Sequence, residues 1–133
     1  MSTSITVSDD CLHALHRLRE RRDVNTVILR HDDAEDGLVL ELEGNLTHDE
    51  VLQALPADEP RLVAHELTFA TSAGMRRSER LLILWCPAAA GEQEQPYSAG
   101  RAVLEELLEG THLRLRASQR EELAYSRLVG QVS

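Results

Sequence analysis

The feature that most constrains the fold is an unbroken apolar run, Leu-Leu-Ile-Leu-Trp at residues 81–85, followed by Cys86 and Pro87. A strand without a polar face is normally covered on both sides, because either bare face would expose apolar side chains to water. Pro87 has no N–H to donate to a sheet, so it ends the strand. The run therefore predicts the middle of a β-sheet with helices packed on each face.

Hydrophobic periodicity and turn residues extend this prediction along the whole chain. Segments rich in β-branched or alternating apolar residues predict strands, and apolar residues at helical spacing predict helices. The expected helices cover residues 8–22, 47–55, 98–108 and 118–128, and the expected strands cover 25–31, 38–43, 61–69, 81–85 and 113–116. We interpret residues 88–96 as an irregular acidic loop.

Capping signals mark three of these helix starts. Ser8 precedes two aspartates, which favour the positive end of a helix dipole. Thr47 with Glu50, and Ser118 with Glu121, have the spacing of a capping box, in which two free N–H groups of the first turn are satisfied. We therefore expect helices to begin at these positions.

The length of 133 residues fits one domain with a single core. The element order α-β-β-α-β-β-α-β-α contains no internal repeat and no linker-like segment. We expect residues 1–133 to form one domain of the α/β (α+β) class, with a central mixed β-sheet and α-helices on both faces.

The charge balance restricts the class of partner. The formal net charge is −9, and nucleic acids and anionic membranes both favour an overall basic field, so neither is expected as the main partner. The 14 basic residues are all Arg, and most of them cluster at residues 17–22, 76–80 and 114–127. Each cluster is either a solvated face or a local positive patch that docks an acidic protein.

The expected location is cytoplasmic. The two cysteines are too few and too far apart to predict a disulfide framework, and no apolar signal segment precedes the first helix. No run approaches the roughly 18 apolar residues of a membrane span.

The segment at residues 32–43 resembles a calcium loop only in part. Asp32, Asp36, Gly37 and Glu43 occupy suitable positions, but Ala34 stands where a ligand is needed. The flanking segments also predict strands, whereas that loop requires helices. We do not expect calcium binding.

The remaining reactive residues predict no catalytic site. His13 and His16 lie about one helical turn apart without a third metal ligand, and we interpret them as solvated surface residues. Cys86 follows the central strand and is expected to be a buried, inert thiol. No glycine cluster forms a phosphate cradle. We expect neither a metal nor a cofactor, nor an enzyme; a small hydrolase or metal protein on an unrelated mixed-sheet fold is the alternative from another class.

Three segments resemble the actin-depolymerising-factor homology (ADF/cofilin) family. They are the strand with its Trp-Cys-Pro ending at residues 77–87, the Tyr-Ser-Ala-Gly-Arg start of a helix at 97–101, and Thr-Val-Ser-Asp-Asp-Cys at 6–11. The element order agrees over nearly the whole chain. The resemblance implies one ADF-homology domain and a monomeric regulator of the actin cytoskeleton that acts by binding, without chemistry.

Within that family, the segment before Tyr97 separates two branches. Cofilins carry lysines there, which meet acidic actin, whereas this chain has Glu92 and Glu94. The glia maturation factor branch is acidic and glutamine-rich at this place and binds the actin-related-protein branching complex, promoting debranching or inhibiting nucleation. We expect that role, and the alternative is a divergent ADF/cofilin that binds actin monomers and filaments and promotes depolymerisation or severing.

The resemblance also implies which residues make contact. The expected contacts with actin or the actin-related proteins are Ser4, Arg19, Arg21, Arg22, Glu92, Glu94, Tyr97 and Arg101. Tyr97 is either a binding anchor or a core residue. Arg77 and Arg80 are expected on a filament-side contact, and Ser2 and Ser4 are candidate phosphorylation sites.

Overall fold

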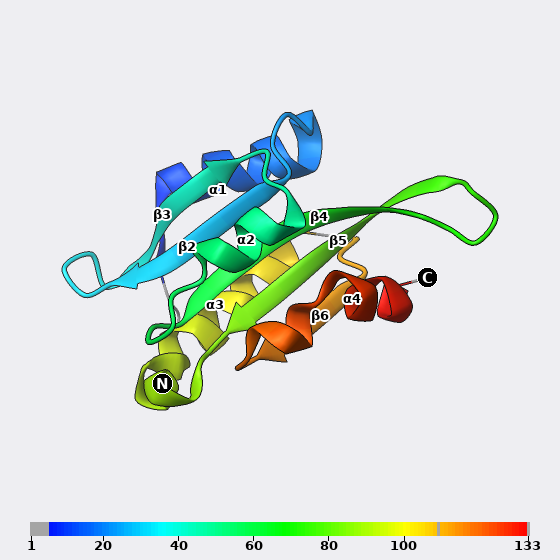
Figure 1. The fold of residues 1–133 in the computed structure, drawn as a ribbon. Coiled ribbons are helices and arrows are strands. Elements are labelled where there is room, and N and C mark those ends of the chain that lie inside the picture. The colour runs from blue at the N-terminus through cyan, green and yellow to red at the C-terminus, as the bar shows by residue number, and fades with distance from the viewer. Residues whose placement is uncertain (1–5, 109, 133) are drawn as a thin grey trace.

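The computed structural model describes residues 6–108 and 110–132, without the side chain of Val132. Within these ranges six strands form one mixed sheet in the order β1-β3-β2-β4-β5-β6 (Figure 1). The strands are β1 (Thr6–Val7), β2 (Thr26–Asp32), β3 (Gly37–Gly44), β4 (Arg61–Ala70), β5 (Arg76–Trp85) and β6 (Leu113–Ala117). The four central strands are antiparallel, and β1 and β6 run parallel to their neighbours. The predicted mixed sheet is confirmed.

Helices cover both faces of this sheet (Figure 1). The helices are α1 (Asp9–His16), continued by a π-helical turn (Arg17–Arg21), α2 (His48–Ala54), α3 (Glu94–Leu107) and α4 (Tyr125–Val132). Short 3-10 helices span Ala88–Gln93 and Arg120–Leu123. Helices α1 and α3 lie on one face, and α2 and α4 lie on the other.

The apolar strand β5 divides its side chains between the two faces. Leu82 and Leu84 pack in the core under α1 and α3, whereas Leu81, Ile83 and Trp85 pack in the core under α2 and α4. Successive side chains of a strand point to opposite faces, so a run without polar residues fills two cores. The strand is buried on both sides, as the sequence predicts.

Two of the three predicted caps are confirmed. Ser8 Oγ accepts a hydrogen bond from the Cys11 amide at 3.2 Å, and Thr47 forms a capping box with Glu50. The third is wrong by one residue. The Glu122 carboxylate accepts the amide of Gln119 at 3.0 Å, which places the capping box on the 3-10 helix, and α4 begins only at Tyr125.

Further elements also differ from the sequence-based expectation. Strand β5 begins at Arg76, five positions earlier, because residues 76–79 pair with the end of β4 and build a long hairpin that extends beyond the sheet (Figure 1). Residues 88–96, expected as an irregular loop, form the 3-10 helix and the start of α3. Pro96 is compatible with this start, because the first turn of a helix needs no N–H donors. The two-residue strand β1 was not predicted.

Candidate protein-docking surface

Strand β1 and helix α3 both approach the start of β3 closely. Strand β1 approaches β3 so closely that a Cβ at Gly37 would lie 2.5 Å from the Thr6 carbonyl oxygen. At the next residue of β3, a Leu38 methyl fills the space where a Cβ of Gly100 in α3 would stand, 2.3 Å away. Both close approaches need a glycine. They anchor β1 and α3 to one dipeptide of β3, Gly37 and Leu38.

Tyr97 fixes the first turns of α3 from inside the core. Its side chain is 4% exposed, and its hydroxyl accepts a hydrogen bond from the His31 amide at 2.7 Å. Burial raises the pKa of the Tyr97 hydroxyl. Of the two roles left open by the sequence, the structure places Tyr97 in the core.

The two acidic residues before Tyr97 differ in their surroundings. Glu94 accepts two hydrogen bonds from the Arg116 guanidinium of β6, at 2.6 and 2.9 Å. This pairing lowers the pKa of the Glu94 carboxyl. Glu92 is exposed and lines a hollow beside Asp33 and Glu59. The negative charge of the segment before Tyr97 is therefore offset by Arg116 at Glu94, but it remains exposed at Glu92.

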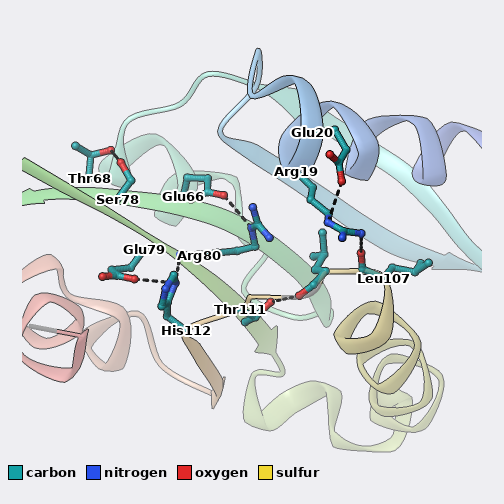
Figure 2. Close-up of polar contacts among 11 residues, drawn as sticks. Arg19, Glu20, Glu66, Thr68, Ser78, Glu79, Arg80, Leu107, Thr111 and His112 are labelled. Carbon is teal, nitrogen blue, oxygen red and sulfur yellow. Dashed lines mark hydrogen bonds and ion pairs between the residues drawn. The ribbon is translucent and has the colours of Figure 1, made fainter.

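The arginines at the end of α1 are not equivalent. Arg19 donates a hydrogen bond to the Leu107 carbonyl oxygen at the end of α3, at 3.0 Å, and forms an ion pair with Glu20 at 3.1 Å (Figure 2). The Arg21 side chain is 66% exposed and lies 3.7 Å from an Asp23 carboxylate oxygen. Arg22 has a left-handed backbone, with φ at 57°, and ends the π-helical turn.

Arg101 lies on α3 near the middle of the helix. Its guanidinium is 4.0 Å from the Glu105 carboxylate one turn later, and about a third of the side chain is exposed. A surface pair of this kind stabilises a helix by only a few tenths of a kcal/mol, on the order of 0.3 to 0.5. Arg101 can therefore turn toward a partner at little energetic expense.

The two arginines expected on the filament side also differ. Arg80 pairs with Glu66 of β4 at 2.8 Å, and both side chains are 13% exposed (Figure 2). Arg77 is half-exposed and pairs with the buried carboxylate of Glu79. His112 Nδ1 lies 2.7 Å from the second Glu79 oxygen (Figure 2).

Sequence reasoning missed the tip of the β4–β5 hairpin. Met75 is 68% exposed, and Arg76 beside it is also exposed. The sequence signal was the turn at Gly74 between two predicted strands, which indicates a hairpin but not how far its strands remain paired.

The reactive residues are arranged as inert groups. Cys11 and Cys86 are buried, and burial raises the pKa of both thiols, which keeps them protonated and weakly nucleophilic. His13 and His16 are exposed. Among residues 6–108 and 110–132 no three His, Cys, Asp or Glu side chains are grouped to hold a metal ion, and no helix in these ranges is long and apolar enough to span a bilayer. Ser2 and Ser4 lie outside the described residues.

Known structures share this architecture over nearly the full chain. The crystal structure of Streptomyces griseoflavus cofilin superimposes with a TM-score of 0.84 at 20% identity, covering 98% of both chains. The solution structure of glia maturation factor from Caenorhabditis elegans gives a TM-score of 0.73 at 21% identity, covering 98% of this chain and 99% of that one.

Sequence comparison identifies the family. Actin-depolymerizing factor 1 of Arabidopsis thaliana is 25% identical over 125 residues, which cover 92% of this chain and 90% of that protein. The sequence pattern of the cofilin/tropomyosin-type actin-binding proteins matches residues 4–133. This chain therefore belongs to the cofilin/tropomyosin-type actin-binding protein family, the ADF-homology family.

Proposed function

We propose that the protein binds actin through the face of α1 and α3 and regulates filament turnover by binding alone. The observation that carries this proposal is that β1 pairs with β3 at Gly37 and α3 packs on β3 at Leu38, so both segments are anchored to the same dipeptide of the sheet. A surface whose segments are already anchored in the fold loses little conformational entropy on docking.

The charges on this surface favour actin as the partner. Because Glu94 is neutralised by Arg116, the start of α3 repels an acidic partner less than its sequence indicates. On the same side of the sheet, the Arg21 side chain is exposed and the Arg101 side chain is partly exposed. We expect a few such residues to contribute most of the binding energy.

The β4–β5 hairpin offers a second contact, suited to a filament. Arg76 and Arg77 are exposed near its tip, beside the exposed Met75. Arg80 already pairs with Glu66 at low exposure, so Arg77 is the better candidate of the two arginines named from sequence. Contacts on two separate faces would let one molecule bind between subunits of a filament.

The second candidate is a glia maturation factor-like role. In that reading the protein binds the actin-related-protein branching complex and promotes debranching or inhibits nucleation. Glu92 supports it, because its exposed carboxylate stands with Asp33 and Glu59 around the hollow at the start of α3. Such a surface favours a partner with a basic patch at that place.

Two binding assays separate the candidates. Cosedimentation with bare actin filaments at low salt is set beside pull-down of the branching complex, with Arg77→Gln as a variant in both. Retention by filaments that weakens in Arg77→Gln supports the actin proposal. Retention by the branching complex alone supports the second candidate, and retention by neither overturns both.

Further expectations belong to this proposal. The protein acts as a monomer in the cytoplasm and catalyses no reaction. Phosphorylation of Ser2 or Ser4 would add roughly two negative charges and weaken docking to an acidic partner. Intact-mass measurement of the native protein would remove the phosphorylation hypothesis if no phosphate is found under any growth condition.

A further inference from the structure

We propose that Arg19 and Glu94, both expected from sequence to contact the partner, instead act as positioning residues that hold the two ends of α3. This inference rests on the proposed function, because it concerns how the α1 and α3 surface is kept in its docking arrangement.

Arg19 holds the C-terminal end of α3. Its guanidinium donates to the carbonyl oxygen of Leu107, the last residue of the helix, at 3.0 Å. The final carbonyls of a helix lack partners within the helix and carry partial negative charge, so a cation is favourable there. Thr111 Oγ1 donates to the next carbonyl oxygen, that of Leu108, at 2.8 Å (Figure 2).

Arg19 thereby connects the two halves of the docking surface. It belongs to the π-helical turn that continues α1, whereas Leu107 belongs to α3. A hydrogen bond between them fixes how far the end of α3 lies from α1. Arg21, two residues along the same turn, pairs locally with Asp23 and makes no such connection among the contacts described for it.

Glu94 holds the N-terminal end of α3 through its carboxylate, which pairs with the Arg116 guanidinium. It is the first residue of the helix, where negative charge is favourable, and the Gln93 N-cap makes no side-chain capping bond. The two parallel hydrogen bonds from Arg116 restrict both distance and orientation, as a bidentate pair does. This joins the start of α3 to β6.

The middle of α3 makes these end contacts important. Within α3 the buried residues are Tyr97, Gly100 and Leu104, and the backbone at Gly100 lies so close to β3 that a Cβ there would be 2.3 Å from a Leu38 methyl. These buried positions lie between residues 97 and 104, so the ends of the helix outside them can still rock about this middle section. Contacts at its two ends oppose the rocking most effectively because they act farthest from the pivot.

The main test compares Arg19→Gln with Arg21→Gln, which removes the same charge from the same turn. Two quantities are measured for each variant: the hydrogen exchange of the α3 amides and the affinity for actin monomers. We expect Arg19→Gln to increase exchange in the last turn of α3 and to weaken binding about fivefold. Arg21→Gln should leave exchange unchanged, and Arg19→Lys should restore part of the affinity because it keeps one donor and the charge.

Arg116→Gln tests the other end without altering Glu94 itself. Increased exchange in the first turn of α3 and weaker binding are expected, although Glu94 would then be freer to meet a partner. Unchanged exchange in both Arg19→Gln and Arg116→Gln would overturn the inference, whatever the affinities. If the wild-type protein binds no actin but the exchange changes occur, the proposed function fails and the positioning role stands.

Discussion

Protonation of His65 should destabilise the fold in mild acid. The His65 side chain is 3% exposed in β4, and burial, together with nearby His48, lowers its pKa to about 4. The unfolded chain binds this proton with a pKa near 6.5. The folded pKa is the lower one. The contribution of neutral His65 to the unfolding free energy is therefore fully present above pH 6.5 and is lost as the pH falls from 6.5 to 4.

The size of the effect follows from the shift. A difference of about 2.5 pKa units corresponds to about 3 kcal/mol of unfolding free energy, most of it lost by pH 4.5. His65 Nδ1 lies 2.8 Å from Thr26 Oγ1 in the interior, so a charged ring would find no counter-ion in that contact. A loss of this size is a large fraction of the stability of a small domain.

The assay is urea unfolding at pH 7.5, 5.5 and 4.5. Wild-type protein is compared with His65→Gln, which cannot titrate in this range, and with His13→Gln, which changes an exposed histidine. Carboxylates contribute to the acid dependence of all three proteins, so the differences between them are diagnostic. We expect His65→Gln to be less stable at pH 7.5 but to lose about 2 to 3 kcal/mol less on acidification. Equal losses in all three proteins would refute the reasoning.

Three further perturbations test the packing and the proposed contacts. Gly100→Ala should lower the unfolding free energy by about 1 to 3 kcal/mol, because its Cβ would lie 2.3 Å from a leucine methyl of β3. Gly91→Ala has open space around it and should not lower this free energy, and thermal unfolding measures both variants. Cys11 and Cys86 should resist a thiol reagent in the native state and react fully in denaturant, and rapid native labelling would contradict their burial. Arg77→Gln should weaken cosedimentation with filaments while leaving monomer binding intact. Equal loss of filament and monomer binding would contradict a filament-specific contact at Arg77.

Local patterns predicted the parts of the fold that depend on neighbouring residues. The apolar run of β5 indicated a strand covered on both faces, and the Ser8 and Thr47 caps were correct because each acts within one helical turn. The start of α3 was missed, since residues 88–96 contain proline and no apolar periodicity. The outer half of β5 was missed because its exposed polar residues follow no hydrophobic alternation.

The candidate site was less predictable, since its decisive contacts join distant residues. Glu94 meets Arg116 from another element 22 positions along, and Arg19 meets Leu107 across 88 positions. Nothing in local spacing distinguishes Arg19 from Arg21, although one holds α3 and the other is largely exposed. Charge patterns therefore indicated where arginines and carboxylates gather, but only the fold showed which of them are already paired.

The most direct test of the docking face is a pair of charge reversals on opposite sides of the sheet. Arg101 lies on α3, and Arg127 is exposed on α4 beneath the other face. Affinity for actin monomers is measured for Arg101→Glu and Arg127→Glu at one salt concentration. A loss of about tenfold or more in Arg101→Glu, with Arg127→Glu close to wild type, is the predicted result. Binding that survives Arg101→Glu and is lost in Arg127→Glu would contradict docking through α1 and α3.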